Sequence, residues 1–485
     1  MRAGSARCSR RALLRTAALG AAALGVAACG TPGTAHPTVQ HAVLNVPFEL
    51  YVVGIPLNSS VTALIQQFVD STFNARHRGV RAVWQPQAGG ANLSAVVTAM
   101  AAGGPVPALL TGPGGSWPTL LPFLAPLDSY LRAQNVNSSL WSPGQLSAFR
   151  VAGALYALPN NAASEAYLYR QDILDALGLP YPDPAWTYLD AQRLWQACTS
   201  NPGGVHRFGC TVPFGPGTAA NPVPEGLAAV VHGFGGAFRS ADHTRCLLSE
   251  PGSIRCGEYF LDLVWSGVAT SGDGYPNPGI FSGQVVFTQG AAPTIIEAVQ
   301  KLGSGAKWDF VPYPSFPVRP VGILHDNFYG INALAPNKEL AWELLRFAAI
   351  DAEWTRFYMR LALAPPGQAP LLEEWEVVLR SVAPVLQTKA LSAWTEPTRR
   401  GDGFYDYEFF RYLPLQAVAA FGGIWPRMWN HQLDVAAGFG QLAAQIDAIE
   451  ATGASEPAPT AASLIAAQKK RLQRLAAMFA PPAGS

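Results

Sequence analysis

The chain has 485 residues, of which 49 % are hydrophobic and only 13 % charged, and glycine and proline together account for 88 positions. Such a length and apolar content can bury a large core, divided over two or three domains. The chain contains few charged residues and no basic runs. These features exclude a nucleic-acid-binding surface, which needs clustered Lys and Arg. Beyond the N-terminal region no apolar stretch approaches about 20 residues, so the sequence predicts no further membrane span.

The N-terminal residues combine five arginines with an uncharged apolar run over residues 17–28, which is typical of an export signal. Residues 26–30 (VAACG) resemble a bacterial lipobox, in which Cys29 would receive a diacylglyceryl group and palmitate-like acyl chains and become the first mature residue. A plain signal peptide or an uncleaved anchor is the alternative. Residues 9–14 (SRRALL) also resemble a twin-arginine export motif. Removing residues 1–28 leaves 28 basic and 32 acidic side chains, a net charge of −4.

Four cysteines would remain in the exported chain: Cys198, Cys210, Cys246 and Cys256. In an oxidising compartment an even number predicts disulfides, with three connectivities open. Short spacing across Pro- and Gly-containing loops favours the pairs Cys198–Cys210 and Cys246–Cys256. A metal site is the competing interpretation, but no Cys-x-x-Cys spacing is present, so no metal is predicted.

The chain after Cys29 begins with a tether over residues 29–43, which show no periodicity. A strand is predicted at 48–53, then a helix whose apolar stripe starts after Ser59, a strand at 80–84, a helix at 95–102 and a strand at 107–111. Alternating strands and helices predict parallel pairing with crossover helices. The first part of the chain is therefore an α/β lobe.

Residues 155–188 contain LYALP, AYLYR, a predicted helix and LPYPDPAWTY. This run resembles the lobe-crossing signature of family 1 extracellular solute-binding proteins of ABC importers. It departs from that signature at Arg170, where Asn is usual, and at Trp186-Thr187, where the Thr-Trp order is reversed. Residues 321–345, with a helix that Asn337 can cap, and residues 281–288 are similar to two further family motifs. The matches cover about residues 45–365 in the family's order, and residues 365–485 match only loosely.

The resemblance implies an α/β, two-lobed periplasmic-binding-protein-like fold with hinge-connected lobes and an extra helical C-terminal region. We expect lobe 1 to comprise residues 44–155 and 306–362, and lobe 2 residues 156–305 and 363–455. A helical tail follows at 456–485, where clustered Lys and Arg favour a solvated helix face over a docking segment.

Such a fold binds its ligand between the lobes, and the resemblance implies a small-molecule ligand, most simply a sugar or oligosaccharide. Aromatic faces, amides and carboxylates in turns after strands are the candidate contacts. Trp117 is the leading candidate, because the preceding GPGGS loop is expected to leave its ring exposed to the ligand. The other candidate ligand-binding residues are Asn58, Ser59, Asn160, Asn161, Glu165, Phe234, Gly235, Gly236, Gly322, Asp326, Asn327, Trp394 and Tyr405. Each of them could instead serve only as a turn or core residue.

The expected function is that of a solute-binding lipoprotein, a monomer without cofactor, anchored on the outer face of the cytoplasmic membrane and delivering its ligand to ABC permease subunits. Common hydrolase and phosphate-binding motifs are absent from the sequence, so no enzymatic activity is predicted. Two alternatives remain open. A secreted glycosidase needs only two carboxylates, and an envelope scaffold could use the same fold without a ligand.

Overall fold

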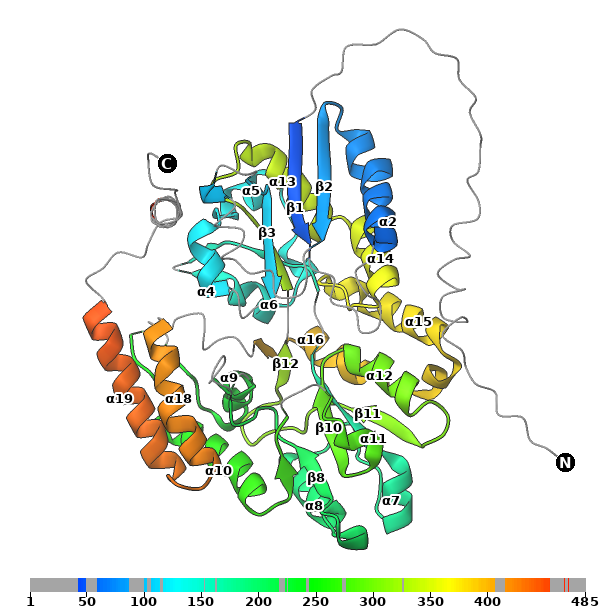
Figure 1. Cartoon of the computed structure of the whole chain (residues 1–485), viewed down its shortest axis with the longest axis vertical. Helices are drawn as coiled ribbons and strands as arrows, with labels where there is room; N and C mark the ends of the chain where they lie inside the picture. Colours follow the sequence, from blue (N-terminus) through cyan, green and yellow to red (C-terminus); the bar gives the residue numbers. More distant parts are fainter. Residues whose placement is uncertain are drawn as a thin grey trace, which may run out of the picture.

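The computed structural model describes residues 42–48, 59–86, 100–102, 106–113, 117–151, 153–161, 164–217, 223–224, 226–240, 244–272, 276–324, 327–405 and 415–453, with residues 466 and 470. They form two lobes, one above the other in Figure 1. The predicted signal, Cys29, most of the tether, Asn58, Asp326 and nearly all of the C-terminal tail lie outside the described residues.

The first lobe is built on two small sheets. β1 (Ala42–Phe48) pairs in parallel with β2 (Val80–Pro86). β13 (Asn327–Ile331) lies between β3 (Leu109–Pro113) and β6 (Leu158–Pro159) and is antiparallel to both. Other elements of this lobe are α2 (Ser59–Val69), α4 (Trp117–Leu120), α5 (Asp128–Ala133), α6 (Pro143–Ala148), β4 (Arg150–Val151), β5 (Ala154–Leu155), α13 (Lys338–Ala349) and α14 (Ala352–Ala362).

The second lobe contains one five-stranded sheet in the order β11-β7-β10-β8-β9. Its strands are β7 (Ala166–Arg170), β8 (Phe208–Thr211), β9 (Ala269–Thr270), β10 (Val285–Gly290) and β11 (Trp308–Val311). Within this sheet β7 is antiparallel to both of its neighbours, β10 and β11. Its helices are α7 (Gln171–Leu177), α8 (Tyr188–Cys198), α9 (Leu227–Val230), α10 (Pro251–Trp265), α11 (Gly279–Ser282), α12 (Pro293–Lys301), α15 (Leu372–Val382), α16 (Glu396–Arg400), α18 (Leu415–Trp429) and α19 (Val435–Gly453).

Both faces of the second sheet are covered, as the side chains of β7 show. Tyr167 and Tyr169 belong to the apolar cluster that includes residues of α8, α10, α18 and α19. Ala166 and Leu168 belong to a separate cluster with residues of α12 and α15. Because successive strand residues point to opposite faces, this alternation places one core on each side of the sheet.

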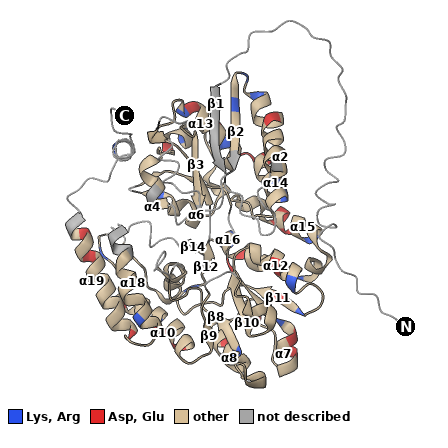
Figure 2. Ribbon diagram, viewed as in Figure 1, with Lys and Arg blue, Asp and Glu red and all other residues tan. Residues whose placement is uncertain are grey.

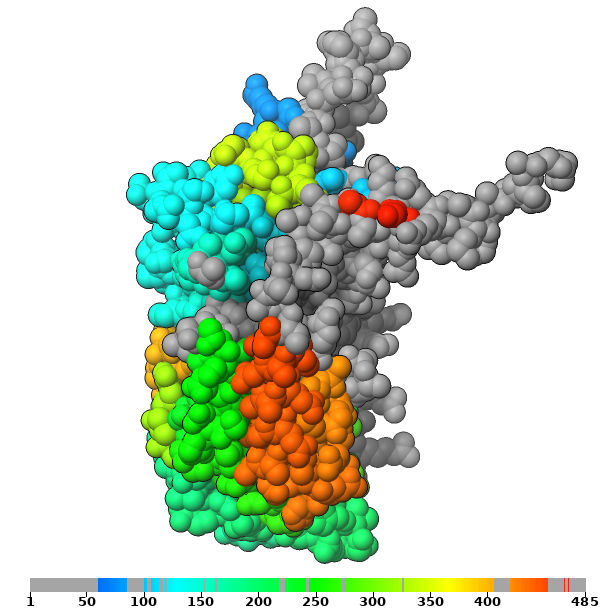
Figure 3. Space-filling view, turned by 90° about the vertical axis from the view of Figure 1, so that its left-hand side faces the viewer, coloured from blue at the N-terminus to red at the C-terminus, as the bar shows by residue number. Residues whose placement is uncertain are grey.

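The predicted helical C-terminal region is present. α18 and α19 pack against each other and against α10, and together they form one side of the second lobe (Figure 3). Arg239, whose side chain is only 2 % exposed, donates from Nη1 to Oε2 of Glu450 in α19 at 2.6 Å. The backbone N–H of Cys246 donates to Oδ1 of Asp447 at 2.7 Å. These bonds fix the last described helix to the body of the lobe.

Several predicted elements are confirmed, and one strand is displaced. α2 covers the predicted stripe after Ser59, and Asn337 caps α13 by accepting a 3.0 Å bond from the N–H of Leu340. The first strand, however, is β1 at 42–48 rather than 48–53. Asn45 and Pro47 concealed it, since both residue types are uncommon inside strands.

The lobe assignment of one segment was wrong. Residues 306–362 are predicted to belong to the first lobe, but the strand Trp308–Val311 pairs with β7 of the second, with Trp308 opposite Arg170 and Val311 opposite Tyr167. Strand order in a sheet follows from packing between distant segments, which the local pattern of residues 308–311 does not contain. The chain therefore returns to the first lobe only after β11.

The predicted disulfides are not formed. Cys198, Cys210, Cys246 and Cys256 are all buried free thiols. Burial raises the pKa of Cys198 to about 12 and that of Cys246 to about 11, so these thiols remain protonated at neutral pH. A disulfide requires two Cβ atoms about 4 Å apart with matched orientation. Sequence spacing does not set that orientation when one cysteine lies on a helix, as Cys198 and Cys256 do.

Candidate functional site

The carboxyl ends of the strands in both lobes lie beside the segments that connect the lobes. In the second lobe Gly290, the last residue of β10, is opposite Ala166, which directly follows the first connecting segment. In the first lobe Pro113, the last residue of β3, is opposite Asn327, which follows the second. The arrowheads of β1, β2 and β3 point toward the second lobe in Figure 1. Open α/β sheets bind ligands beyond strand carboxyl ends, so the candidate site lies between the lobes.

Segments around residues 159–166, 322–328 and 363–371 connect the lobes, and backbone hydrogen bonds join them on the side of the first lobe. Asn160 N–H donates to Asn327 O at 3.0 Å, and Gly367 N–H donates to Asn160 O at 3.3 Å. Gln145 of α6 is fully buried and donates from Nε2 to Gly367 O at 3.1 Å. The three segments therefore meet as one unit at the end of the first lobe.

On the side of the second lobe the connecting segments are joined again. Glu165 N–H donates to Ile323 O at 2.7 Å, and Ser164 N–H donates to Trp394 O at 3.2 Å. The strand β12 (Gly322–Leu324) pairs in parallel with β14 (Gly403–Tyr405). This arrangement has the construction of a hinge, in which a few residues at element ends absorb the motion between two rigid bodies.

The predicted asparagines contribute to this hinge. Asn161 accepts through Oδ1 a 2.6 Å bond from the N–H of Asn327, and the backbone of Asn160 bonds to both of the other segments. Their polar groups thus hold neighbouring backbone, which is the alternative role that the sequence left open. Contact between these residues and a ligand remains a prediction.

Glu165, near the end of the first connecting segment, is also fully buried. Its Oε2 accepts a 2.6 Å hydrogen bond from the phenol hydroxyl of Tyr313. Tyr313 follows β11, so this bond ties the start of β7 to the loop after its neighbouring strand. The sequence suggested Glu165 as a ligand contact, but not its bond to Tyr313.

Two predicted aromatic contacts are core residues instead. Trp117 is 3 % exposed and packs edge-on against Phe149 and Phe328, with ring centroids 5.2 and 5.3 Å away. The expectation that its loop leaves the ring exposed is therefore wrong. Trp394 is fully buried and packs edge-on against Phe310. Both rings are covered by residues distant in sequence.

The predicted glycine turn also has a packing role. Phe234 is buried in an aromatic cluster with Tyr259 and Phe316. Gly235 has a positive φ of 75°, and a Cβ on Gly236 would lie 2.6 Å from the backbone nitrogen of Ser253 in α10. The turn accordingly needs glycine for backbone conformation and for close approach.

Gly322 is a further predicted contact with a packing role. A Cβ on Gly322 would lie 2.5 Å from Cβ of Pro397 and 3.2 Å from Cβ of Ser164, so glycine permits the close approach of α16 to the hinge. Ser59 is the first residue of α2, and Tyr405 is the last of β14. The side chains of Ser59 and Tyr405 lie outside the described part of the chain.

A buried polar cluster that the sequence did not indicate lies at the carboxyl end of the second sheet. Gln289 of β10 is fully buried, donates from Nε2 to Val212 O at 2.6 Å and accepts at Oε1 from the hydroxyl of Thr211. Thr288 accepts at Oγ1 from the N–H of Asn277 at 3.2 Å. Buried polar groups cost free energy unless they are paired. This cluster therefore holds the ends of β8 and β10 in one arrangement.

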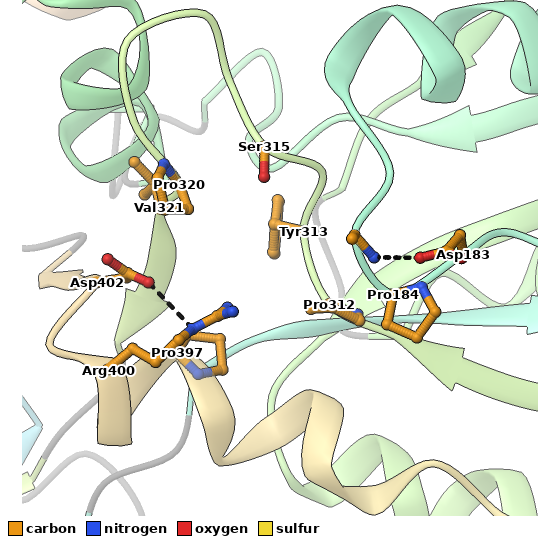
Figure 4. Close-up of a pocket in the computed structure, with 11 residues that line it drawn as sticks. Asp183, Pro184, Pro312, Tyr313, Ser315, Pro320, Val321, Pro397, Arg400 and Asp402 are labelled. Atoms are coloured by element: carbon orange, nitrogen blue, oxygen red, sulfur yellow. Dashed lines mark hydrogen bonds and ion pairs between the residues drawn. The ribbon is translucent and has the colours of Figure 1, made fainter.

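The structure also contains a pocket beside the hinge, on the second lobe, with a volume of about 280 Å³. Its walls come from the loop before α8, the loop between β11 and β12, and the segment from α16 to β14 (Figure 4). The lining residues are Asp183, Pro184, Ala185, Pro312, Tyr313, Ser315, Pro320, Val321, Pro397, Arg400 and Asp402. None of these residues is among the ligand contacts predicted from the sequence.

Charged side chains are scattered over both lobes rather than collected in one patch (Figure 2). Within the described ranges, no cluster of three or more His, Cys, Asp or Glu could hold a metal ion. The same part of the chain contains no helix with the length and hydrophobicity of a membrane span.

Two lobes joined by crossing segments, with strand carboxyl ends facing the junction, define a periplasmic-binding-protein-like fold. The model of the bacterial extracellular solute-binding protein family matches residues 58–352, more than half of the chain. The protein belongs to that family.

Solved structures share this fold at low sequence identity. The sugar-binding protein MalE from Xanthomonas citri is 16 % identical with a TM-score of 0.67, over 86 % of this chain and 100 % of its own. The cyclic α-maltosyl-1,6-maltose binding protein from Arthrobacter globiformis is 16 % identical with a TM-score of 0.66, over 84 % and 99 %. The substrate-binding protein Lmo0181 from Listeria monocytogenes, solved with cycloalternan, is 14 % identical with a TM-score of 0.64, over 85 % and 99 %.

Proposed function

We propose that this protein captures a neutral sugar or oligosaccharide between its two lobes and delivers it to the permease of an ABC importer. The observation that carries the proposal is the placement of the strand carboxyl ends of both lobes at one hinge. A ligand bound there touches both lobes at once and makes its full set of contacts only when they close. The scattered charges support a ligand without a net charge (Figure 2). The similar structures of a cycloalternan complex and of a sugar-binding protein support the carbohydrate class.

We further propose that the chain is exported, possesses a lipid on Cys29 and acts as a monomer at the outer face of the cytoplasmic membrane. The lipobox-like residues 26–30 support this. Mass spectrometry of membrane-extracted protein should find Cys29 as an acylated N-terminus, and Cys29→Ala should release the protein from the membrane fraction. Unmodified wild-type protein in the soluble fraction would contradict the anchor but not the binding function.

The binding function is tested by titration calorimetry with a panel of mono- and oligosaccharides, combined with small-angle X-ray scattering. A bound sugar should decrease the radius of gyration as the lobes close. Ala291→Arg introduces a long charged side chain directly after β10, where Ala291 is partly exposed, and should abolish that binding. Ala436→Arg on the exposed face of α19 is the matched control and should bind normally.

Three outcomes would contradict the proposal. Sugar-induced closure of the lobes that survives Ala291→Arg would place the interlobe ligand elsewhere. Hydrolysis of a chromogenic glycoside by the purified protein would favour the glycosidase alternative, and absence of sugar binding together with a captured envelope partner would favour the scaffold.

A further inference from the structure

We infer that the pocket beside α16 is a second ligand site, which takes one neutral sugar ring or a polyol of that size and works independently of the solute site between the lobes. Sites for drug-sized ligands usually span about 300–1,000 Å³. At about 280 Å³ this pocket fits a single ring rather than an oligosaccharide. Its lining residues belong to the second lobe or to the link next to the hinge, so the site is complete without lobe closure.

The apolar part of the wall is rigid. Four prolines, the ring of Tyr313 and Val321 line the cavity, and Figure 4 shows the proline rings on both sides of Tyr313. Tyr313 is 6 % exposed, and its hydroxyl donates a hydrogen bond to Glu165, which fixes the position of the ring. Because proline fixes its own backbone angle, little conformational freedom is lost when a ligand binds. Such faces suit the C–H surfaces of a sugar ring.

The polar part of the wall offers both donors and acceptors. Arg400 pairs with Asp402 through Nε and Oδ2 at 3.2 Å, and its side chain is 51 % exposed, which leaves the two Nη groups available to a ligand. Asp183 accepts from the N–H of Ala185 at Oδ1, and Oδ2 remains available. Hydroxyl groups, which both donate and accept, match this mixture.

The charges in the pocket exclude an anionic ligand. One guanidinium and two carboxylates give the lining a formal charge of −1, and the guanidinium is already paired with one of the carboxylates. A phosphate or carboxylate ligand would face two carboxylates, Asp183 and Asp402, with the single guanidinium of Arg400 to balance all three negative charges. A neutral polyhydroxyl compound has no such penalty.

The test uses the full chain and calorimetric titration with D-glucose, D-mannose, D-galactose and glycerol. Ala185→Phe fills the cavity from an exposed wall position without removing a polar group. It should weaken at least one of these binding events by about tenfold or more. Ala436→Phe on α19 is the matched control and should leave the affinity unchanged. Arg400→Leu should weaken the same event, because the Nη donors are lost.

Two further measurements test where the monosaccharide binds and whether that binding is independent of the interlobe site. Hydrogen exchange should slow in residues 312–321 and 397–402 on adding the monosaccharide, and the radius of gyration should stay constant. Ala291→Arg should remove interlobe binding and leave this event intact, so failure of either site is distinguishable. The inference is overturned if no probe binds, if Ala185→Phe has no effect, or if protection appears only between the lobes.

Discussion

The phenol oxygen of Tyr313 lies 2.6 Å from Oε2 of Glu165, so the wall of the pocket is hydrogen-bonded to a buried residue of the first connecting segment. Both side chains are almost completely excluded from solvent. Since Glu165 also bonds through its N–H to Ile323, the pair connects two of the crossing segments with the loop after β11.

Tyr313→Phe should lower the free energy of unfolding by about 1–3 kcal/mol, because a buried carboxyl loses a hydrogen-bond donor. Urea denaturation measures the change. Tyr181→Phe is the control: Tyr181 donates to Asp175 at the same 2.6 Å but is 45 % exposed, so its loss should be nearly neutral. Equal effects of the two variants would show that burial of the Tyr313 pair is unimportant.

Trp117→Ala should destabilise the first lobe by about 3–5 kcal/mol, the usual effect of truncating a buried large aromatic residue. The ring contacts of Trp117 with Phe149 and Phe328 are lost in this variant. Trp117→Phe keeps part of the packing and should have a smaller effect on the thermal midpoint. A variant with an unchanged midpoint and weakened sugar binding would instead restore Trp117 as a ligand contact.

Asp128 makes a pH-dependent contribution to the stability of the folded state. Burial raises the pKa of Asp128, but bonds from the Leu155 N–H and Arg150 outweigh it, so the net pKa lies below the usual 3.8. A carboxylate whose pKa is lower in the folded state stabilises the fold above its unfolded pKa. That stability is lost as the pH falls through the folded pKa. Asp128→Asn should therefore destabilise by about 1 kcal/mol at neutral pH, and its unfolding curve should converge with wild type below about pH 4. A constant difference down to acid pH would contradict this.

Gly144→Ala tests the contact between α6 and β14. A Cβ at Gly144 would lie 2.5 Å from the carbonyl oxygen of Gly403, so the two elements must separate. We expect a loss of about 1–3 kcal/mol and a larger radius of gyration by X-ray scattering. Gly440→Ala in α19 has no neighbour within 4 Å and should stabilise slightly through helix propensity. An unchanged radius in the Gly144 variant would mean that α6 does not limit how closely the lobes approach.

Glu450→Ala should lower the free energy of unfolding by about 1–3 kcal/mol, because it removes one hydrogen-bonded ion-pair partner of a buried guanidinium. Arg239 is 2 % and Glu450 20 % exposed. The exposed pair of Arg76 and Glu353, at 52 % and 47 %, provides the control, and Glu353→Ala should change stability by less than about 1 kcal/mol. Chemical denaturation compares the two variants. Similar small effects would show that α19 does not depend on the ion pair.

The features predicted correctly are those that depend on residues close together in the sequence. The stripe of α2 and the cap of α13 depend on residues within a few positions of each other, and the crossing motifs are likewise continuous in sequence. The errors concern contacts between distant segments. Trp117 is covered by Phe328, which belongs to a strand that enters the first lobe after the second lobe has largely been built.

The candidate site was predicted less well for the same reason. Asn161 is a residue type that often binds ligands from turns, yet its Oδ1 accepts a hydrogen bond from the backbone N–H of Asn327. Tyr313 and Arg400 come together in one pocket from segments with no shared motif. No local pattern predicts which side chains face the same cavity.

The position of β13 has a consequence for biogenesis. It is the central strand of its sheet, between β3 and β6, but it is synthesised after most of the second lobe. Until residue 331 is available, β3 and β6 expose unpaired edges, which are prone to aggregation. The first lobe therefore cannot complete its fold before the second has largely been translated, and such non-local pairing slows folding. An N-terminal fragment that ends before β13 should remain a substrate for chaperones rather than become a separate domain.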